Sequence, residues 1–244
     1  MDKENLQSGF AAGTKVHTDQ GIKRIEEIQV GDMMLSKSKR GGEISYQPVI
    51  NIFRSIEKQK IFLLRYMDNY IPPSEDDPFS PTMNLPGMAP SKIHAEVLTP
   101  NHPIWINENI STEREACWEI AANLIDGDQV VFNDESIGGV ISVDPLVETH
   151  IENIFYLSTD GQFVSMIVDT RNNELKIYYI AHLVLEAYKN KFLPEDHWPL
   201  ADQILVGDIE KYPFLEEIVQ YLQNPQQYFA YTEVFNIEVA NYHR

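Results

Sequence analysis

The 244-residue sequence is poor in cysteine, in basic residues and in long hydrophobic runs. Its single cysteine, Cys117, excludes an internal disulfide and a cysteine-based metal cluster. The 19 Lys and Arg residues are outnumbered by 37 Asp and Glu, and the resulting net charge of −18 repels nucleic acid and anionic membranes. No apolar run approaches the roughly 18 residues that a membrane-spanning helix needs. We therefore expect no nucleic acid and no membrane among the partners.

The N-terminal residues Met1–Glu4 are too polar and acidic for a secretory signal peptide. Together with the single cysteine, this slightly favours the cytoplasm in an otherwise open localisation. Apolar residues make up 43% of the chain, which is enough to bury a sizeable core. The length fits one large domain or a domain with an insertion.

Most of the chain is typical of short strands separated by turn residues. The strand-like segments are residues 15–18, 33–36, 48–56, 61–66, 93–98, 104–106, 129–132, 139–143, 149–157 and 234–239. Apolar residues recur at helical spacing within 175–191 and again within 215–222, after Pro213. We predict a mainly β domain over residues 9–244, with an N-terminal extension at 1–8. A Pro-rich loop at 69–92 and a partly helical insertion at 171–230 interrupt it.

One short pattern occurs three times, as an apolar residue, any two residues and then Gly-Asp. The copies are Ile28–Asp32, Leu124–Asp128 and Ile204–Asp208, and the last two also share an upstream Trp and Ala. In such a turn, Gly permits an unusual backbone angle and Asp binds the turn amides. The repetition predicts a pseudo-symmetric β fold built from duplicated units.

Four blocks occur in an order that resembles the Hint domains of inteins and hedgehog-type self-processing proteins, especially bacterial intein-like and pretoxin forms. They are Phe10–Val16 with Gly21–Asp32, then Leu98–Pro103, Trp118–Asp128 and Val234–His243. The resemblance spans residues 10–157 and 234–243. It implies a β horseshoe with pseudo-two-fold symmetry.

The resemblance also implies a chemistry. A Cys or Ser at the first position of the domain attacks the preceding carbonyl, which converts a peptide bond into an ester or thioester. Thr99 and His102 would hold that peptide and protonate the leaving amine, with help from Asn101. This role needs an imidazole whose charge changes near neutral pH. Both groups must then face the backbone of residues 8–10.

Two further positions are implied near the end of the chain. Asn236 stands where many inteins carry Asp, and His243 matches the late histidine that assists C-terminal cleavage. The resemblance implies no cofactor and no metal. The substrate is the flanking polypeptide of the same chain, which is cleaved or spliced in a single turnover.

The sequence departs from the family pattern at both ends. Gly9 occupies the nucleophile position and has no side chain, while Ser8 is one residue away. The final strand with His-Asn is missing after Arg244. Residues 1–8 resemble a protease-tag remnant in part, so Gly9 is either engineered or naturally degenerate. We expect the chain as written to be inactive at the first step.

The competing interpretation is a degenerate, non-catalytic Hint scaffold. It would bind a protein partner through the acidic insertion and the Pro-rich loop. A cysteine hydrolase using Cys117 is disfavoured, because no motif places a histidine beside it, and we expect this cysteine to be buried. The pair His182 and Glu186 lacks a third metal ligand, and the acidic run Glu75–Asp77 lacks the spacing of a calcium loop.

Overall fold

The chain folds mainly into β-strands, as predicted. The computed structural model describes residues 8–37, 44–68, 92–107, 114–132, 134, 136–157, 165–180, 204–205 and 228–240. The chain divides into two compact units, Met1–Asp144 with Thr232–Arg244, and Pro145–Tyr231, and each is described by itself. The Pro-rich loop up to residue 91, most of the segment predicted to be helical, and His243 lie outside the described residues.

The first unit is built around one large antiparallel sheet. The strands of this sheet are β1 (Phe10–Ala11), β2 (Lys15–Thr18), β3 (Gly21–Arg24), β4 (Met33–Ser36), β5 (Ser45–Arg54), β7 (Phe62–Asp68), β8 (Ile93–Leu98), β9 (Pro103–Ile106), β10 (Cys117–Ile120), β11 (Gln129–Val131), β12 (Ile137–Pro145) and β19 (Val234–Val239). The short strand β6 (Gln59–Lys60) belongs to a separate two-stranded sheet. Short 3-10 helices η2 (Ile25–Glu27) and η4 (Ala121–Asn123) follow β3 and β10. The strand β18 (Tyr231–Thr232) lies at the boundary of the two units.

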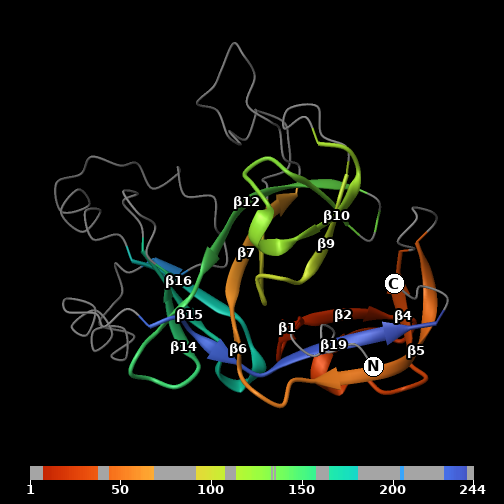
Figure 1. Cartoon of the computed structure of the whole chain (residues 1–244), viewed down its shortest axis with the longest axis horizontal. Coiled ribbons are helices and arrows are strands. Elements are labelled where there is room, and N and C mark those ends of the chain that lie inside the picture. Colours follow the sequence, from red (N-terminus) through yellow and green to blue (C-terminus); the bar gives the residue numbers. More distant parts are fainter. Residues whose placement is uncertain are drawn as a thin grey trace, which may run out of the picture. The chain divides into compact units, whose positions relative to one another are not determined.

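From the middle of this sheet outward, the two halves place their strands in matching order, with β1–β5 matching β8–β12 and β19 matching β7. Among the described residues the full strand order reads β10-β9-β11-β12-β7-β8-β1-β19-β5-β4-β2-β3. Each strand of one half therefore has a counterpart in the other half, and the axis passes between β8 and β1. The two end segments, β10–β11 and β2–β4, lie at opposite ends of the sheet (Figure 1). This is the pseudo-two-fold arrangement that the repeat predicts.

Backbone hydrogen bonds repeat across this axis. Ile25 N donates to Thr14 O at 2.8 Å, and its counterpart Ala121 N donates to His102 O at 2.9 Å. Phe10, next to the axis, is paired with its own counterpart, Leu98. Such self-pairing is expected only where two related segments meet on a two-fold axis.

The repeated Gly-Asp turns account for this symmetry. Gly31 and Gly127 both have positive φ, +97° and +87°, which L side chains rarely adopt. The carboxylates of Asp32 and Asp128 accept backbone N–H groups three residues upstream, at 2.9 and 3.0 Å. The two turns therefore share one conformation, because the same Gly-Asp pair forms each of them. The third copy differs where it is described, because Ile204–Leu205 form a strand.

Each half of the first unit has its own apolar core. One core gathers Val16, Ile25, Ile28, Val49 and Phe235, and the other gathers Leu64, Leu98, Ile106, Ala121, Leu124, Val130 and Val140. The Phe10 ring packs against both cores. The first strand of the domain is therefore fixed at the junction of the two halves.

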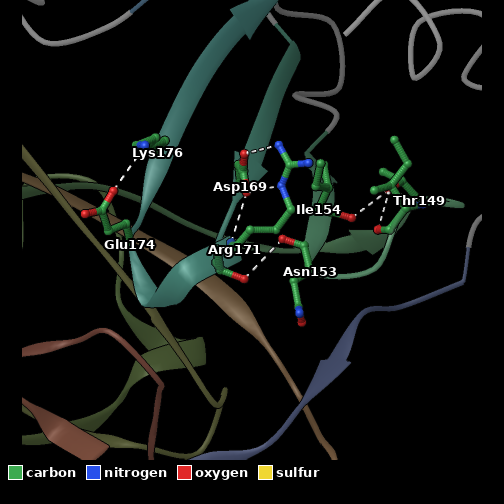
Figure 2. Close-up of polar contacts among 9 residues, drawn as sticks. Thr149, Asn153, Ile154, Asp169, Arg171, Glu174 and Lys176 are labelled. Carbon is green, nitrogen blue, oxygen red and sulfur yellow. Dashed lines mark hydrogen bonds and ion pairs between the residues drawn. The ribbon is translucent and has the colours of Figure 1, made fainter. Parts of the chain in front are cut away.

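The second unit contains a sheet with the strand order β13-β14-β15-β16-β17 among the described residues. The strands are β13 (Val147–Glu148), β14 (Ile154–Leu157), β15 (Ser165–Asp169), β16 (Lys176–Ile180) and β17 (Ile204–Leu205), with the 3-10 helix η5 (Arg171–Asn173) between β15 and β16. Figure 2 shows how its turns are held. The Arg171 guanidinium donates to both carboxylate oxygens of Asp169, and Thr170 binds the carbonyl of Asn153.

Two predictions fail in this unit. Residues 176–180, placed in a helix by spacing, form β16, because all five pair with β15. The predicted strand at 149–157 is broken at 149–153, where Asn153 has a φ of +59° and the Thr149 hydroxyl binds the carbonyls of Ile151 and Ile154. At 176–180 strand pairing overrides the helical spacing, whereas at 149–153 a local turn overrides the strand pattern. The predicted boundaries of the insertion, 171 and 230, stay a prediction.

The two symmetric turns predict unequal stability effects. The Asp128 side chain is fully buried and bonded to Arg114 at 2.8 Å, whereas Asp32, bonded to Lys23, is partly exposed. Asp128→Ala should lower the free energy of unfolding by about 3 kcal/mol, because it removes the buried acceptor that binds both the Arg114 guanidinium and the Ile125 N–H. Asp32→Ala should cost clearly less. Urea unfolding of both variants measures this, and equal losses would contradict the asymmetry.

Candidate functional site

Thr99 binds both the N–H and the C=O of Gly9, the residue just before β1. Gly9 N donates to Thr99 Oγ1 at 3.0 Å, and Thr99 N donates to Gly9 O at 2.9 Å. Thr99 directly follows β8 and is only 1% exposed. Because β8 and β1 meet at the pseudo-two-fold axis, the fold brings these two residues together without a long loop.

His102 lies three residues beyond Thr99 and is buried at the same place. Its ring contacts the Phe10 ring, with the centroids 4.2 Å apart. Its backbone N donates to Thr99 O at 3.1 Å, which closes the turn. The Nδ1 atom of His102 is buried and has no hydrogen-bond partner among the described residues. Burying a polar atom without a partner costs free energy. This nitrogen can therefore gain a hydrogen bond from a group that binds beside it.

Burial sets the charge of this imidazole. It lowers the pKa of His102 from 6.5 to about 4. The ring is therefore neutral between pH 5 and pH 8. The expectation of a charge change near neutral pH is wrong for this folded state, because the sequence motif does not reveal how deeply the ring is buried. A neutral imidazole can still accept or relay a proton.

Asn236, on β19, contacts the residue before Gly9. Its Nδ2 donates to Ser8 Oγ at 3.4 Å, and its Oδ1 accepts the N–H of Ile237 at 2.9 Å. Ser8 is 9% exposed. The segment 8–10 is thus in contact with three of the predicted site residues: Thr99, His102 and Asn236.

Gly9 has a packing role that the sequence does not reveal. A Cβ added at this position would lie 2.4 Å from the carbonyl oxygen of Phe235 and 2.9 Å from its carbonyl carbon. Both atoms are backbone, so a side chain at residue 9 requires β19 to shift. The position predicted for the nucleophile therefore fits a glycine.

Asn101, the other predicted site residue that the structure describes, is not brought to this segment. Asn101 is exposed in the turn, and no hydrogen bond of its side chain to residues 8–10 is found among the described residues. His243 lies outside them. Cys117 is exposed on the edge strand β10, so the expectation that it is buried is wrong.

Three residues of this region were missed by sequence reasoning. The Phe10 ring contacts the His102 ring, and the Phe235 carbonyl packs against Gly9. Glu96 occupies the position equivalent to Ser8 in the other half of the sheet. Burial raises the pKa of Glu96 to about 7, which Lys15 and a hydrogen bond with Thr14 partly offset. The alignment of residues 10–14 with 98–102 is the signal that could have revealed Glu96.

No metal site and no membrane span occur in the described part of the chain. No group of three or more His, Cys, Asp or Glu there could hold a metal ion. No helix within the same ranges is both long and apolar enough to cross a membrane.

Comparison with known proteins gives similarity at the level of solved structures. No protein-family model and no curated protein matches the chain. It is similar to the gp41-1 intein, at 19% identity over 61% of this chain and 91% of that one, with a TM-score of 0.36. It is similar to the bacterial intein-like domain from Clostridium thermocellum, at 15% identity over 72% and 99%, with a TM-score of 0.39. It is also similar to the AceL NrdHF class 3 split intein, at 12% identity over 95% of this chain and 86% of that one, with a TM-score of 0.36. TM-scores below 0.5 do not establish a common fold.

Because the pKa of His102 is lowered, we predict that the free energy of unfolding falls as the solution becomes acidic. The folded pKa of about 4 lies below the ordinary 6.5, so the contribution is complete above pH 6.5 and is lost as pH falls through 4. NMR titration of the His102 ring should give a midpoint near 4. In His102→Gln the corresponding part of the pH dependence should vanish. A midpoint near 6.5 would contradict the buried placement.

The close approach of β19 predicts the cost of a side chain at residue 9. Gly9→Ala should lower the free energy of unfolding by about 1–3 kcal/mol and move the amide resonances around Phe235. Gly21→Ala is the control, since its Cβ would meet no atom within 4 Å and only its φ of +112° is unfavourable. It should leave the Phe235 resonances in place. Unchanged Phe235 signals in Gly9→Ala would overturn the packing role.

Proposed function

We propose that the first unit is a self-processing domain of the Hint class, which rearranges and cleaves a peptide bond of its own chain. The observation that carries this proposal is the hydrogen bond from Gly9 N to Thr99 Oγ1, at 3.0 Å. It joins the Thr of the Thr-x-x-His motif to the start of the domain, where the family resemblance requires it.

The proposed chemistry assigns one task to each group. A nucleophile on residue 9 attacks the carbonyl carbon of residue 8, and the bond from that carbon to N of residue 9 breaks. The nucleophile loses its proton, and the leaving nitrogen gains one. Thr99 holds this nitrogen, and the unpartnered Nδ1 of neutral His102 relays the proton. No cofactor is needed.

Several finer assignments belong to the same proposal. Asn236 orients the segment from the side of β19, Asn101 assists Thr99, and His243 acts in C-terminal cleavage. The substrate is the flanking polypeptide, and the outcome is splicing or simple cleavage of the kind that matures toxins. With Gly9 in place, the step at the bond between residues 8 and 9 does not run, because glycine offers no nucleophile.

A second candidate is a non-catalytic scaffold of the same class that binds a protein partner. The observation in its favour is the fit of Gly9 against the Phe235 carbonyl, which a chain selected for a nucleophile at this position would not need. The partner would bind the acidic insertion and the Pro-rich loop.

Gly9→Cys separates the two candidates. With a thiol present, the self-processing domain should release residues 1–8, which mass spectrometry detects. Gly9→Ala introduces the same Cβ without a thiol and should not cleave. Adding Thr99→Val or His102→Ala to Gly9→Cys should slow cleavage by about 10²-fold or more. A folded Gly9→Cys protein that stays intact would favour the scaffold.

A further inference from the structure

Phe10 lies where the two halves of the first unit meet, and both halves fix its position. Its backbone pairs with Leu98 of β8 on one side and with Phe235 of β19 on the other. Its ring packs against the apolar cores of both halves. Close packing on two sides leaves a side chain few alternative rotamers. The Phe10 ring is therefore a rigid surface at the start of the domain.

The His102 ring lies against this surface. The centroids of the two rings are 4.2 Å apart, whereas the other ring pairs in the described part of the chain have centroids 5.2 to 5.7 Å apart. His102 Nδ1 has no hydrogen-bond partner among the described residues. Packing against Phe10, and not a hydrogen bond of Nδ1, therefore orients the imidazole.

The contact with Phe10 also limits how far water reaches the imidazole. Only 8% of His102 is exposed. Burial is the cause that lowers the pKa of His102, and no charged group among the described residues contributes to it. The neutral state of the imidazole therefore depends on the apolar groups that cover it, and the Phe10 ring is in direct contact with it.

We propose that Phe10 is a positioning residue of the self-processing site, which keeps the His102 imidazole dry and in one orientation beside the bond to be cleaved. The proposal rests on the self-processing function proposed above and adds a residue that takes no part in the chemistry itself. Phe10 directly follows Gly9, whose N–H and C=O are both bound by Thr99. The reacting segment thus carries the surface against which its own proton relay packs. Because that surface also packs against both cores, the relay is in place only when both halves are folded.

NMR titration of His102 tests the proposal without any cleavage. Phe10→Ala removes the ring, so the midpoint of the His102 titration should rise from about 4 toward 6.5. Phe10→Leu keeps an apolar side chain but not the ring, and its midpoint should lie between those of the unchanged chain and Phe10→Ala. If Phe10→Ala does not fold, Phe10→Leu decides the question.

The pH profile of cleavage is a readout that a merely structural effect would not move. In the Gly9→Cys background, Phe10→Ala should slow the release of residues 1–8 about tenfold or more at neutral pH. As pH falls from about 7 to about 5.5, the imidazole of Phe10→Ala gains a proton and can no longer accept one, whereas in the Gly9→Cys parent it stays neutral. The ratio of the Phe10→Ala rate to the parent rate should therefore fall as well. This ratio removes the contribution of the thiol, which both proteins share.

Phe62→Ala is the matched control. Phe62 is also half-buried and also pairs with Leu98, from the β7 side of β8, but no contact of its ring with the His102 ring is found among the described residues. Phe62→Ala should lower the free energy of unfolding, as the loss of any packed ring does. It should leave the His102 midpoint near 4 and the ratio of cleavage rates independent of pH.

Equal movement of the midpoint in Phe10→Ala and Phe62→Ala would overturn the positioning role. A folded Phe10→Ala protein whose His102 midpoint stays near 4 would overturn it as well. If Gly9→Cys alone stays intact while Phe10→Ala raises the midpoint, the control of His102 by Phe10 stands and only the self-processing function falls.

Discussion

The reciprocal pair of hydrogen bonds between Gly9 and Thr99 is the constraint on which the site depends. It lies beside the pseudo-two-fold axis, where β1 and β8 of the two halves pair with each other. Because each half brings its own Gly-Asp turn and its own core, the position of these two strands is fixed from both sides. The segment before β1 is therefore held at the junction of the halves, next to the His102 ring.

The sequence predicts the parts of this fold that have a local cause. The turns at Gly31 and Gly127 are predictable because a positive φ favours glycine. The proximity of Thr99 to residues 8–10 follows from a motif whose order resembles that of a known family. The strand at 176–180 and the depth of His102 could not be predicted, because pairing with β15 and packing around the ring decide them.

The close contact between Gly9 and the Phe235 carbonyl belongs to the same category. It joins residues far apart in the sequence, and no pattern marks it. In physical terms, the missing side chain lets β19 approach the start of the domain. The Ser8 side chain is buried beside this contact and accepts a hydrogen bond from Asn236.

Amide hydrogen exchange at Gly9 tests the central claim most directly. If the Thr99 hydroxyl holds this N–H inside the protein, the Gly9 amide should exchange at least about 10²-fold more slowly than in an unstructured peptide. In Thr99→Val, which keeps the shape but removes the acceptor, that protection should be lost while the amides of β7 stay protected. A Gly9 amide that exchanges freely in the folded, unchanged protein would contradict the account.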